Sequence, residues 1–267
     1  MPKLRVHNFT ISLDGFAAGP HQRETEPLGD GGSRLHEWMF ATRSARAKRG
    51  LEGGHEGVDD DFVARNDVGI GATIIGRNMI GPIRGPWQDE SWTGWWGENP
   101  PFHNDVFVLT HHRRESLTME GGTTFHFIHD TPDAVLTRAF NAANGQDVML
   151  GGGAATIQQF LRAGLIDEMH VVIVPIMLGD GERLFDNLAG RLDQYECVEL
   201  VSSNAATHAR ITRSPRYQRK KHSTASVNEV RLPVPIQDPR VLVVVATARR
   251  EGVVADEVTD GDAAVER

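Results

Sequence analysis

Three consecutive glycines between a short apolar segment and an amphipathic one constrain this chain more than any other feature of its sequence. The run reads DVMLGGGAATIQQFL over residues 147–161, and it predicts a strand that is followed at once by a helix. Glycine lacks the Cβ that would clash where a backbone turns sharply or closely approaches another group. The helix points free N–H groups and the positive end of its dipole at this loop, which suits a phosphate.

The residues of this run that we expect to contact a phosphate are Gly151, Gly152, Gly153, Ala154 and Thr156. The alternative is a plain tight turn between a strand and a helix. The spacing does not match the glycine fingerprint of the common dinucleotide-binding fold, and the run lies late in the chain. A dinucleotide cofactor is therefore a hypothesis that other residues must support.

Composition excludes several classes of protein. The chain has 267 residues and a net charge of −8, which disfavours a general binder of nucleic acids or anionic membranes. The single cysteine, Cys197, rules out an internal disulfide and fits a reducing compartment. No segment approaches the roughly 20 apolar residues of a membrane-spanning helix. We expect a soluble cytoplasmic protein whose partner is a small molecule.

Strand and helix patterns alternate along the first 213 residues. Strands are predicted over residues 4–13, 70–77, 106–110, 123–128 and 168–174, besides the one before the glycines, and a hairpin over 198–202 and 206–212. Helices are predicted over residues 35–47 after Ser33, over 59–65, and over 132–144 with Thr131 as N-cap and Pro132 in the first turn. This order predicts an α/β fold, with a mixed, mostly parallel sheet flanked by helices and an antiparallel C-terminal hairpin.

The sequence changes character after Thr212. A basic run is followed by prolines, one apolar segment at residues 241–246, and an acidic end. The apolar segment could form a strand, but a flexible tail is the favoured interpretation. We therefore expect one domain over residues 1–213 and an extension over residues 214–267.

Polar residues that follow predicted strands are the next candidates, because ligands of α/β sheets bind at the carboxyl edge. One strand leads into Thr110, His111, His112, Arg113 and Arg114. Arginines there would suit the 2′-phosphate of NADPH, which a guanidinium can hold with two hydrogen bonds, although a solvated basic turn is the alternative. Another strand ends at Gly76 and Arg77, and Arg77 either contacts an anionic cofactor or lies at the surface.

Two further residues are candidates for the substrate side. Asp14 ends the first strand, where a carboxylate could orient or protonate a substrate, but the Asp14-Gly15 pair alone favours a turn. Trp38 could stack on a heterocyclic substrate. The other four tryptophans fall in a proline-rich loop over residues 81–101, and most of them are better suited to fix that loop on the core.

Several catalytic classes have no support in the sequence. There is no Ser-His-Asp elbow, no phosphate-binding loop of the Walker type, no zinc-ligand spacing and no cysteine nucleophile with a partner. Hydrolases and phosphotransferases are therefore disfavoured.

Six short motifs, in order over residues 2–213, resemble the dihydrofolate-reductase-like family that includes the reductase domain of bifunctional riboflavin-biosynthesis deaminase-reductases. They are SLDGFAAGP (12–20), IGRNM (75–79), VFVLT (106–110), LGGG (150–153), LIDE (165–168) and PIMLGDGERLF (175–185). The chain departs from the bifunctional enzymes because it carries no zinc-ligand pattern of the deaminase half. Its loop between Pro20 and Asp59 is long, and the tail after Thr212 has no counterpart in the family.

The resemblance implies NADPH as hydride donor and a homodimer. It implies that Gly76, Arg77, Thr110 with the residues after it, and residues 151–156 lie along the cofactor. It places Asp14 and Trp38 on the substrate side, with residues 179–185 bordering the site. The expected activity is a reductase of a small heterocycle, resembling the phosphoribosylaminouracil reductase of riboflavin biosynthesis or dihydrofolate reductase. The alternatives are a non-catalytic NADP(H)-binding module and a flavin-dependent reductase.

Overall fold

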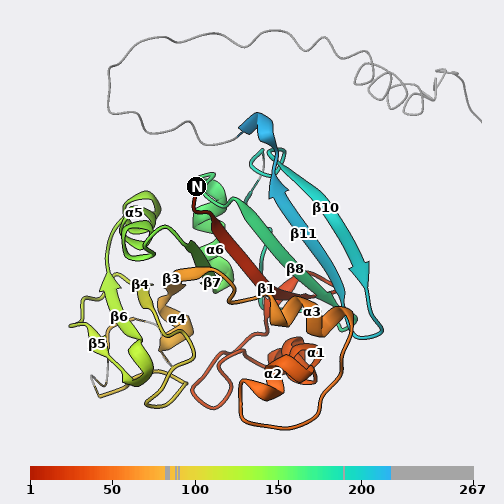
Figure 1. Cartoon of the computed structure of the whole chain (residues 1–267), viewed down its shortest axis with the longest axis horizontal. Coiled ribbons are helices and arrows are strands. Elements are labelled where there is room, and N and C mark those ends of the chain that lie inside the picture. The colour runs from red at the N-terminus through yellow and green to blue at the C-terminus, as the bar shows by residue number, and fades with distance from the viewer. Residues whose placement is uncertain (82–84, 88, 90, 189, 218–267) are drawn as a thin grey trace, which may run out of the picture. The chain divides into compact units, whose positions relative to one another are not determined.

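Figure 1 shows a computed structural model of the chain, which describes residues 1–81, 85–87, 89, 91–188 and 190–217. The strands are β1 (Leu4–Ser12), β2 (Phe16–Ala18), β3 (Ile70–Gly76), β4 (Asp105–Leu109), β5 (Leu117–Thr118), β6 (Thr124–Ile128), β7 (Asp147–Gly152), β8 (Glu168–Val174), β9 (Glu182–Arg183), β10 (Tyr195–Ser202) and β11 (Thr207–Arg213). The helices are α1 (Glu37–Phe40), α2 (Arg43–Ala47), α3 (Val58–Ala64), α4 (Arg77–Ile80), α5 (Pro132–Ala142) and α6 (Ala154–Arg162), with 3-10 turns at Gly32–His36, Glu120–Gly122 and Pro215–Tyr217.

Nine strands form one sheet in the order β10-β11-β8-β1-β7-β3-β4-β6-β5. The six strands from β8 to β6 are parallel, because β1 pairs in parallel with β7 and β8, and β3 and β4 continue the same direction to β6. The antiparallel pair of β10 with β11 lies on one side, and the short β5 closes the other. The mixed, mostly parallel sheet and the C-terminal hairpin are thus confirmed.

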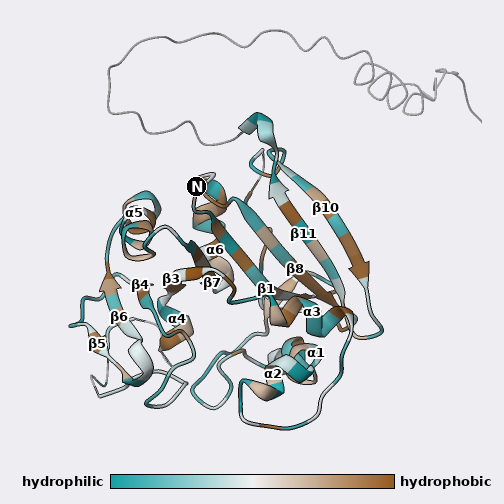
Figure 2. Cartoon of the chain, in the orientation of Figure 1, coloured by the Kyte–Doolittle hydropathy of each residue, from teal (hydrophilic) through white to brown (hydrophobic). Residues whose placement is uncertain are grey.

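Both faces of the parallel strands are covered, because successive residues of a strand point to opposite sides. Ile74 belongs to the core that α5 and α6 cover, whereas Ile75 belongs to a second core under α4 and the tryptophan loop. A third apolar cluster joins β8 to the helices α1 to α3. In Figure 2, β3 is largely hydrophobic, which fits a strand buried on both faces, whereas hydrophobic and hydrophilic segments follow one another along β1.

The single helix predicted over residues 35–47 is wrong, because the chain forms a 3-10 turn and two short helices there. Thr42 interrupts it: its Oγ1 donates to Met39 O at 2.7 Å and accepts from Ala45 N at 3.3 Å. Such local side-chain bonds compete with the helical ladder and favour a new N-cap. The first turn begins after Gly31, so Ser33 is not an N-cap.

Other predicted elements are confirmed. The strand at β8 has the predicted bounds, and Thr131 caps α5 by accepting from Ala134 N, with Pro132 in the first turn. The sequence did not predict the two-stranded sheet of β2 and β9, which brings Glu182 beside Ala18. The predicted extension over residues 214–267 lies almost entirely outside the described residues.

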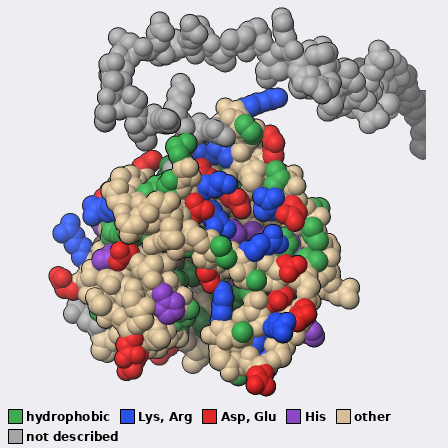
Figure 3. Space-filling view, viewed as in Figure 1, with side chains coloured by type: hydrophobic (Ala, Val, Ile, Leu, Met, Phe, Trp, Pro, Cys, Tyr) green, Lys and Arg blue, Asp and Glu red, His purple; other side chains and the backbone are tan. Residues whose placement is uncertain are grey.

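Charge is dispersed over the face shown in Figure 3, where Lys and Arg side chains alternate with Asp and Glu over β8, β10 and β11. In the described part of the chain, none of the helices has the length and apolar character needed to span a bilayer.

Candidate functional site

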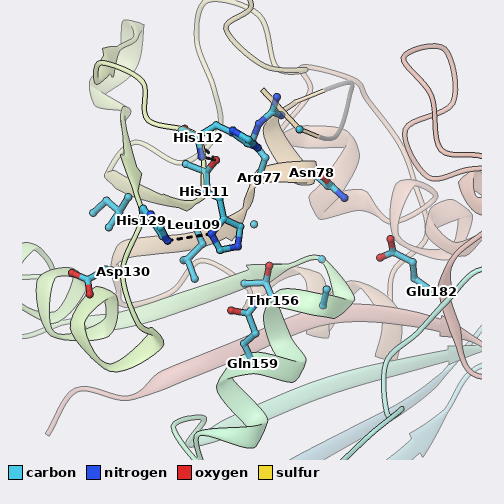
Figure 4. Close-up of a pocket in the computed structure, with 16 residues that line it drawn as sticks. Arg77, Asn78, Leu109, His111, His112, His129, Asp130, Thr156, Gln159 and Glu182 are labelled. Atoms are coloured by element: carbon cyan, nitrogen blue, oxygen red, sulfur yellow. Dashed lines mark hydrogen bonds between the residues drawn. The ribbon is translucent and has the colours of Figure 1, made fainter. Parts of the chain in front are cut away.

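Four neighbouring parallel strands end at one cavity of about 270 Å³, here named cavity A. It is lined by residues that directly follow β3, β4, β6 and β7, together with the first turns of α6 (Figure 4). The lining residues are Gly76, Arg77, Asn78, Gly85, Leu109, Thr110, His111, His112, Ile128, His129, Asp130, Gly153, Ala155, Thr156, Gln159 and Glu182. The carboxyl edge of the sheet is therefore where this chain keeps space for a ligand.

Two glycines of the run differ in their surroundings: Gly152 is tightly packed, whereas Gly153 has free space beside it. A Cβ at Gly152, where φ is +114°, would lie 2.8 Å from Phe9 Cε2, so this glycine is required by packing. At Gly153 a Cβ would meet nothing within 4 Å, and the residue borders cavity A instead. The peptide bond between them is cis. The open position is the one where a ligand can approach the backbone.

The start of α6 faces cavity A without a side-chain cap. Gly153 is the N-cap residue and makes no side-chain hydrogen bond, while Ala155 in the first turn is exposed and lines the cavity. The first N–H groups of a helix have no partner within the helix, and the dipole adds positive charge there. Thr156 is buried behind them, and its Oγ1 would lie only 2.2 Å from a Cβ at residue 76, which requires Gly76.

Arg77 is the main cation of cavity A. Its guanidinium stacks on the Trp87 ring at 3.4 Å, and its Nε and Nη1 are buried without a hydrogen-bond partner among the described residues. Burial, and then the charge of Arg114, lower the pKa of Arg77 to about 10. Both causes act against the charged form of Arg77.

The turn after β4 presents two histidines to cavity A. Thr110 Oγ1 accepts from His112 N at 3.0 Å and donates to His112 O, so this threonine shapes the turn. His111 Nδ1 lies 3.2 Å from His129 Nε2. The turn continues into Arg113 and Arg114, which line a separate cavity C of about 600 Å³ with Arg138. Cavity C adjoins cavity A because Ile128 and His129 line both.

A second cavity of about 250 Å³, cavity B, lies on the other side of the glycine loop. Its lining combines the middle of β1, the segment before the 3-10 turn at Gly32–His36 and the glycine run. The residues are His7, Asn8, Phe9, Thr10, Ala17, Ala18, Gln22, Pro27, Leu28, His36, Asn78, Met79, Trp95, Gly151, Gly153, Ala154 and Glu182. Cavities A and B share Asn78, Gly153 and Glu182, so one ligand could extend from A to the mouth of B.

Most of the predicted cofactor residues come together in this geometry. Cavity A is lined by Gly76, Arg77, Thr110, His111, Gly153 and Thr156, while Gly151 and Ala154 line cavity B and Arg113 lines cavity C. Gly152 lines none of the three and packs against Phe9. The sequence reasoning missed Gln159 and His129. Gln159 could have been found from the helical periodicity, since it lies on the cavity side of α6 with Ala155.

Neither predicted substrate residue lines cavity A, B or C. Trp38 is 4% exposed and donates from Nε1 to Thr10 Oγ1 at 3.0 Å, so it packs behind the wall of cavity B. Asp14 accepts from the backbone N–H of Gly179 at 2.7 Å and of Leu178 at 3.2 Å. Its position supports the turn interpretation of the Asp-Gly pair.

Replacing Asp14 by asparagine should remove part of the acid sensitivity of the fold. The Ser12 hydroxyl first, and the Gly179 and Leu178 amides next, lower the pKa of Asp14 from 3.8 to about 2, against the opposing effect of burial. Because the folded pKa is below the unfolded one, this stabilisation is complete above 3.8 and is lost as the pH falls toward 2. Thermal unfolding measured across that range should depend less on pH in Asp14→Asn than in the parent. An identical pH dependence would contradict this role.

A model of the RibD C-terminal domain family matches residues 2–207. A solved structure from Shewanella sp. PV-4, provisionally described as a riboflavin biosynthesis protein, has a TM-score of 0.52 and 22% identity, covering 80% of this chain and 99% of that one. Dihydrofolate reductase from Enterococcus faecalis, complexed with NADP(H), has a TM-score of 0.43 and 13% identity over 79% of this chain and 96% of that one.

One curated relative shares a short segment. The uncharacterized protein YyaP of Bacillus subtilis (strain 168) is 41% identical over 49 residues, which are 18% of this chain. The match spans about a quarter, 26%, of that relative. Of the structural similarities, the one to the Shewanella protein shows the fold.

Proposed function

The chain belongs to the RibD C-terminal domain family, and from this membership we propose that it is an NADPH-dependent reductase that transfers a hydride to a small heterocyclic substrate. The family supports a reductase of the kind found in riboflavin biosynthesis, and the resemblance seen in the sequence motifs agrees with that membership. The substrate class and the use of NADPH are parts of this proposal.

The observation that carries the proposal is the anion-binding character of cavity A. Cavity A is bordered by the uncapped start of α6 and by Arg77, whose buried Nε and Nη1 have no hydrogen-bond partner among the described residues. A diphosphate offers the negative charge and the acceptor oxygens that both groups lack. We assign the cofactor diphosphate to Gly153, Ala155 and Arg77.

The 2′-phosphate of NADPH belongs, in this proposal, to cavity C. Arg113 and Arg114 line it together with Arg138, whose Nη2 also lies 3.2 Å from Asp130 Oδ2. Several guanidinium groups at one cavity favour a doubly charged phosphate over a ribose hydroxyl. The chain should therefore prefer NADPH to NADH.

Cavity B is the proposed substrate site. The reduced nicotinamide supplies the hydride, and the protein orients the two reactants and excludes water from between them. Asn78, Gly153 and Glu182 line both cavities and would surround the point where cofactor and substrate meet. The lining of cavity B includes the aromatic residues Phe9 and Trp95, a residue type that suits a flat heterocycle.

Titration with NADPH, followed by tryptophan fluorescence, tests the proposal. Trp87 stacks on Arg77 and Trp95 lines cavity B, so both indoles report on the site. We expect saturable quenching with NADPH and affinity for NADH weaker by roughly tenfold or more, because the arginines of cavity C would lose the 2′-phosphate. No saturable response to either nucleotide would overturn the reductase proposal, and equal affinities would overturn the assignment of cavity C.

Turnover separates an enzyme from a binding module. Loss of NADPH absorbance should be measured with pterin and pyrimidine compounds that carry a C=N or C=O bond to be reduced. A protein that binds NADPH and oxidises it with none of them would fit the non-catalytic alternative. The homodimer implied by the family resemblance remains a prediction, which light scattering of the purified protein would test.

A further inference from the structure

Two buried histidines lie next to cavity B without lining it. His170 in β8 is 1% exposed and His208 in β11 is 0% exposed. Their rings stack 5.2 Å apart, and Phe62 of α3 stacks on both, at 4.3 Å from His170 and 4.5 Å from His208. Histidine is seldom buried without a partner, so the hydrogen bonds of this pair need an account.

The two rings form one continuous chain of hydrogen bonds between α3 and β1. Asn8 N donates to His170 Nδ1 at 3.3 Å, and His170 Nε2 lies 3.0 Å from His208 Nδ1. His208 Nε2 lies 2.7 Å from Asp59 Oδ1, and the other oxygen of Asp59 accepts from Ser203 Oγ at 3.0 Å. Every ring nitrogen of the pair is therefore used.

The groups at the two ends of this hydrogen-bonded series, the Asn8 N–H and the Asp59 carboxylate, determine which ring nitrogens carry protons. A backbone N–H can only donate, so His170 Nδ1 must accept and His170 carries its proton on Nε2. That proton is donated to His208 Nδ1, which leaves the Nε2–H of His208 for the Asp59 carboxylate. Both imidazoles are therefore neutral, in the same tautomer, and aligned in one direction.

The surroundings of His170 favour the neutral form of that ring. Burial, then the neighbouring His208, His7 and Arg65, lower the pKa of His170 to about 3, and Glu168 acts weakly in the opposite direction. These groups come from β11, β1, the end of α3 and β8, and Asp59 of α3 faces the other ring. Protonation of His170 would also leave the Asn8 N–H facing another donor.

The segment that these hydrogen bonds contact is an irregular part of β1. Asn8 has a φ of 51°, in the left-handed region that L-residues seldom adopt, and the pairing of β1 with β8 shifts between Val6 and Phe9. The residues of this bulge, together with Thr10, form one wall of cavity B. Phe9 in turn packs against Gly152 of the glycine loop.

We propose that His170, His208 and Asp59 are positioning residues, a neutral hydrogen-bonded relay that holds Asn8 in its left-handed conformation and so shapes the wall of cavity B. Removal of the relay would let the bulge revert to regular pairing, which turns alternate side chains of β1 toward the opposite face. The effect of the relay on substrate binding rests on the proposed function, but its effect on the conformation of Asn8 can be tested in the ligand-free protein.

The first test uses nuclear magnetic resonance of the ligand-free full chain. In the parent at neutral pH, the imidazole nitrogens should show both histidines neutral with the proton on Nε2. In His170→Phe, which keeps a stacked ring but removes the acceptor, the Asn8 amide should exchange with solvent roughly tenfold faster. Phe62→Leu is the matched control, because it disturbs packing on the same rings and leaves the hydrogen bonds in place.

The relay can also be broken at its more accessible end if His170→Phe does not fold. In Asp59→Ala the two histidines should no longer hold one tautomer, and the Asn8 amide should exchange faster. Asp59→Asn retains an oxygen that accepts from His208, so this variant should keep the parent's tautomers and its slow exchange at Asn8. Unchanged tautomers and unchanged Asn8 exchange in Asp59→Ala would overturn the proposal. Equal acceleration in Phe62→Leu would overturn it as well, since packing alone would then account for the effect.

The consequence for the site is measured with NADPH as the probe. Because Phe9 joins the bulge to the glycine loop, His170→Phe should weaken NADPH binding severalfold, and Phe62→Leu should not. If His170→Phe binds NADPH as tightly as the parent while its Asn8 amide exchanges faster, the relay affects only the bulge. The proposed effect on the cofactor loop would then be overturned. If the parent binds no NADPH, the proposed function fails while the exchange data still decide whether the relay holds Asn8.

Discussion

Replacing Ala155 by glutamate should nearly abolish NADPH binding while leaving the fold as stable as before or slightly more so. Ala155 is exposed in the first turn of α6 and lines cavity A. A carboxylate there would face the proposed diphosphate, and like charges at such a separation cost several kcal/mol at an effective dielectric constant of about 20. We expect the dissociation constant for NADPH to rise on the order of a hundredfold or more.

The opposite sign of the stability effect makes this substitution informative. An acidic residue in the first turn of a helix stabilises it by about 0.3–1 kcal/mol through the helix dipole. Ala155→Gln is the matched control, since it has a similar size and no charge. Fluorescence titration with NADPH and thermal unfolding should be measured for the parent, Ala155→Glu and Ala155→Gln. If glutamate and glutamine weaken NADPH equally, bulk rather than charge is responsible and the diphosphate does not lie at the start of α6.

Replacing Arg77 by methionine should weaken NADPH binding roughly 30- to 100-fold. Methionine keeps the apolar length of the side chain against Trp87 and removes the charge. The expected loss follows from a charge-assisted contact of about 2–3 kcal/mol with a phosphate. Since Nε and Nη1 of Arg77 are buried with no hydrogen-bond partner in the part of the chain that the structure describes, the variant should lose little stability.

Arg49→Met is the control for Arg77→Met. Arg49 stacks on Phe40 with its Cζ 4.6 Å from the ring centre, and it does not line cavity A, B or C. NADPH affinity should be unaltered in this variant. An Arg77→Met protein that binds NADPH like the parent would show that the diphosphate lies elsewhere, whatever its stability.

Local sequence patterns predicted the elements of the sheet well. The strand that became β8 and the helix α5 after Thr131 were identified because their apolar periodicity and capping residues lie within a few positions of each other. The helix over residues 35–47 was wrong because a hydroxyl at Thr42 outweighed an otherwise helical pattern. The β2–β9 pair could not be foreseen, since two- and three-residue strands have no periodicity to read.

The residues of cavity A were predictable where they directly follow a strand or begin the helix after the glycine run. Gly76, Arg77, Thr110 and His111 were found this way, because parallel strands bring their carboxyl ends to one edge. Cavity B was not, because it combines the middle of β1 with a loop twenty or so residues later and a glycine run far along the chain. Asp14 shows the converse: its place at a strand end suggested chemistry, and its contacts show a loop anchor.

By itself the sequence determined the alternation of strands and helices and the glycine run before α6, because these depend on residues that are close together in the sequence. It also determined the family to which the chain belongs, because that depends on motifs in a set order. The tertiary structure alone decided that the glycine at 153 is open while the one at 152 is filled by Phe9, and that Asp59, His208 and His170 line up behind Asn8. Such relations depend on distances between residues that lie 38 to 162 positions apart in the sequence, and only the packed chain sets those distances.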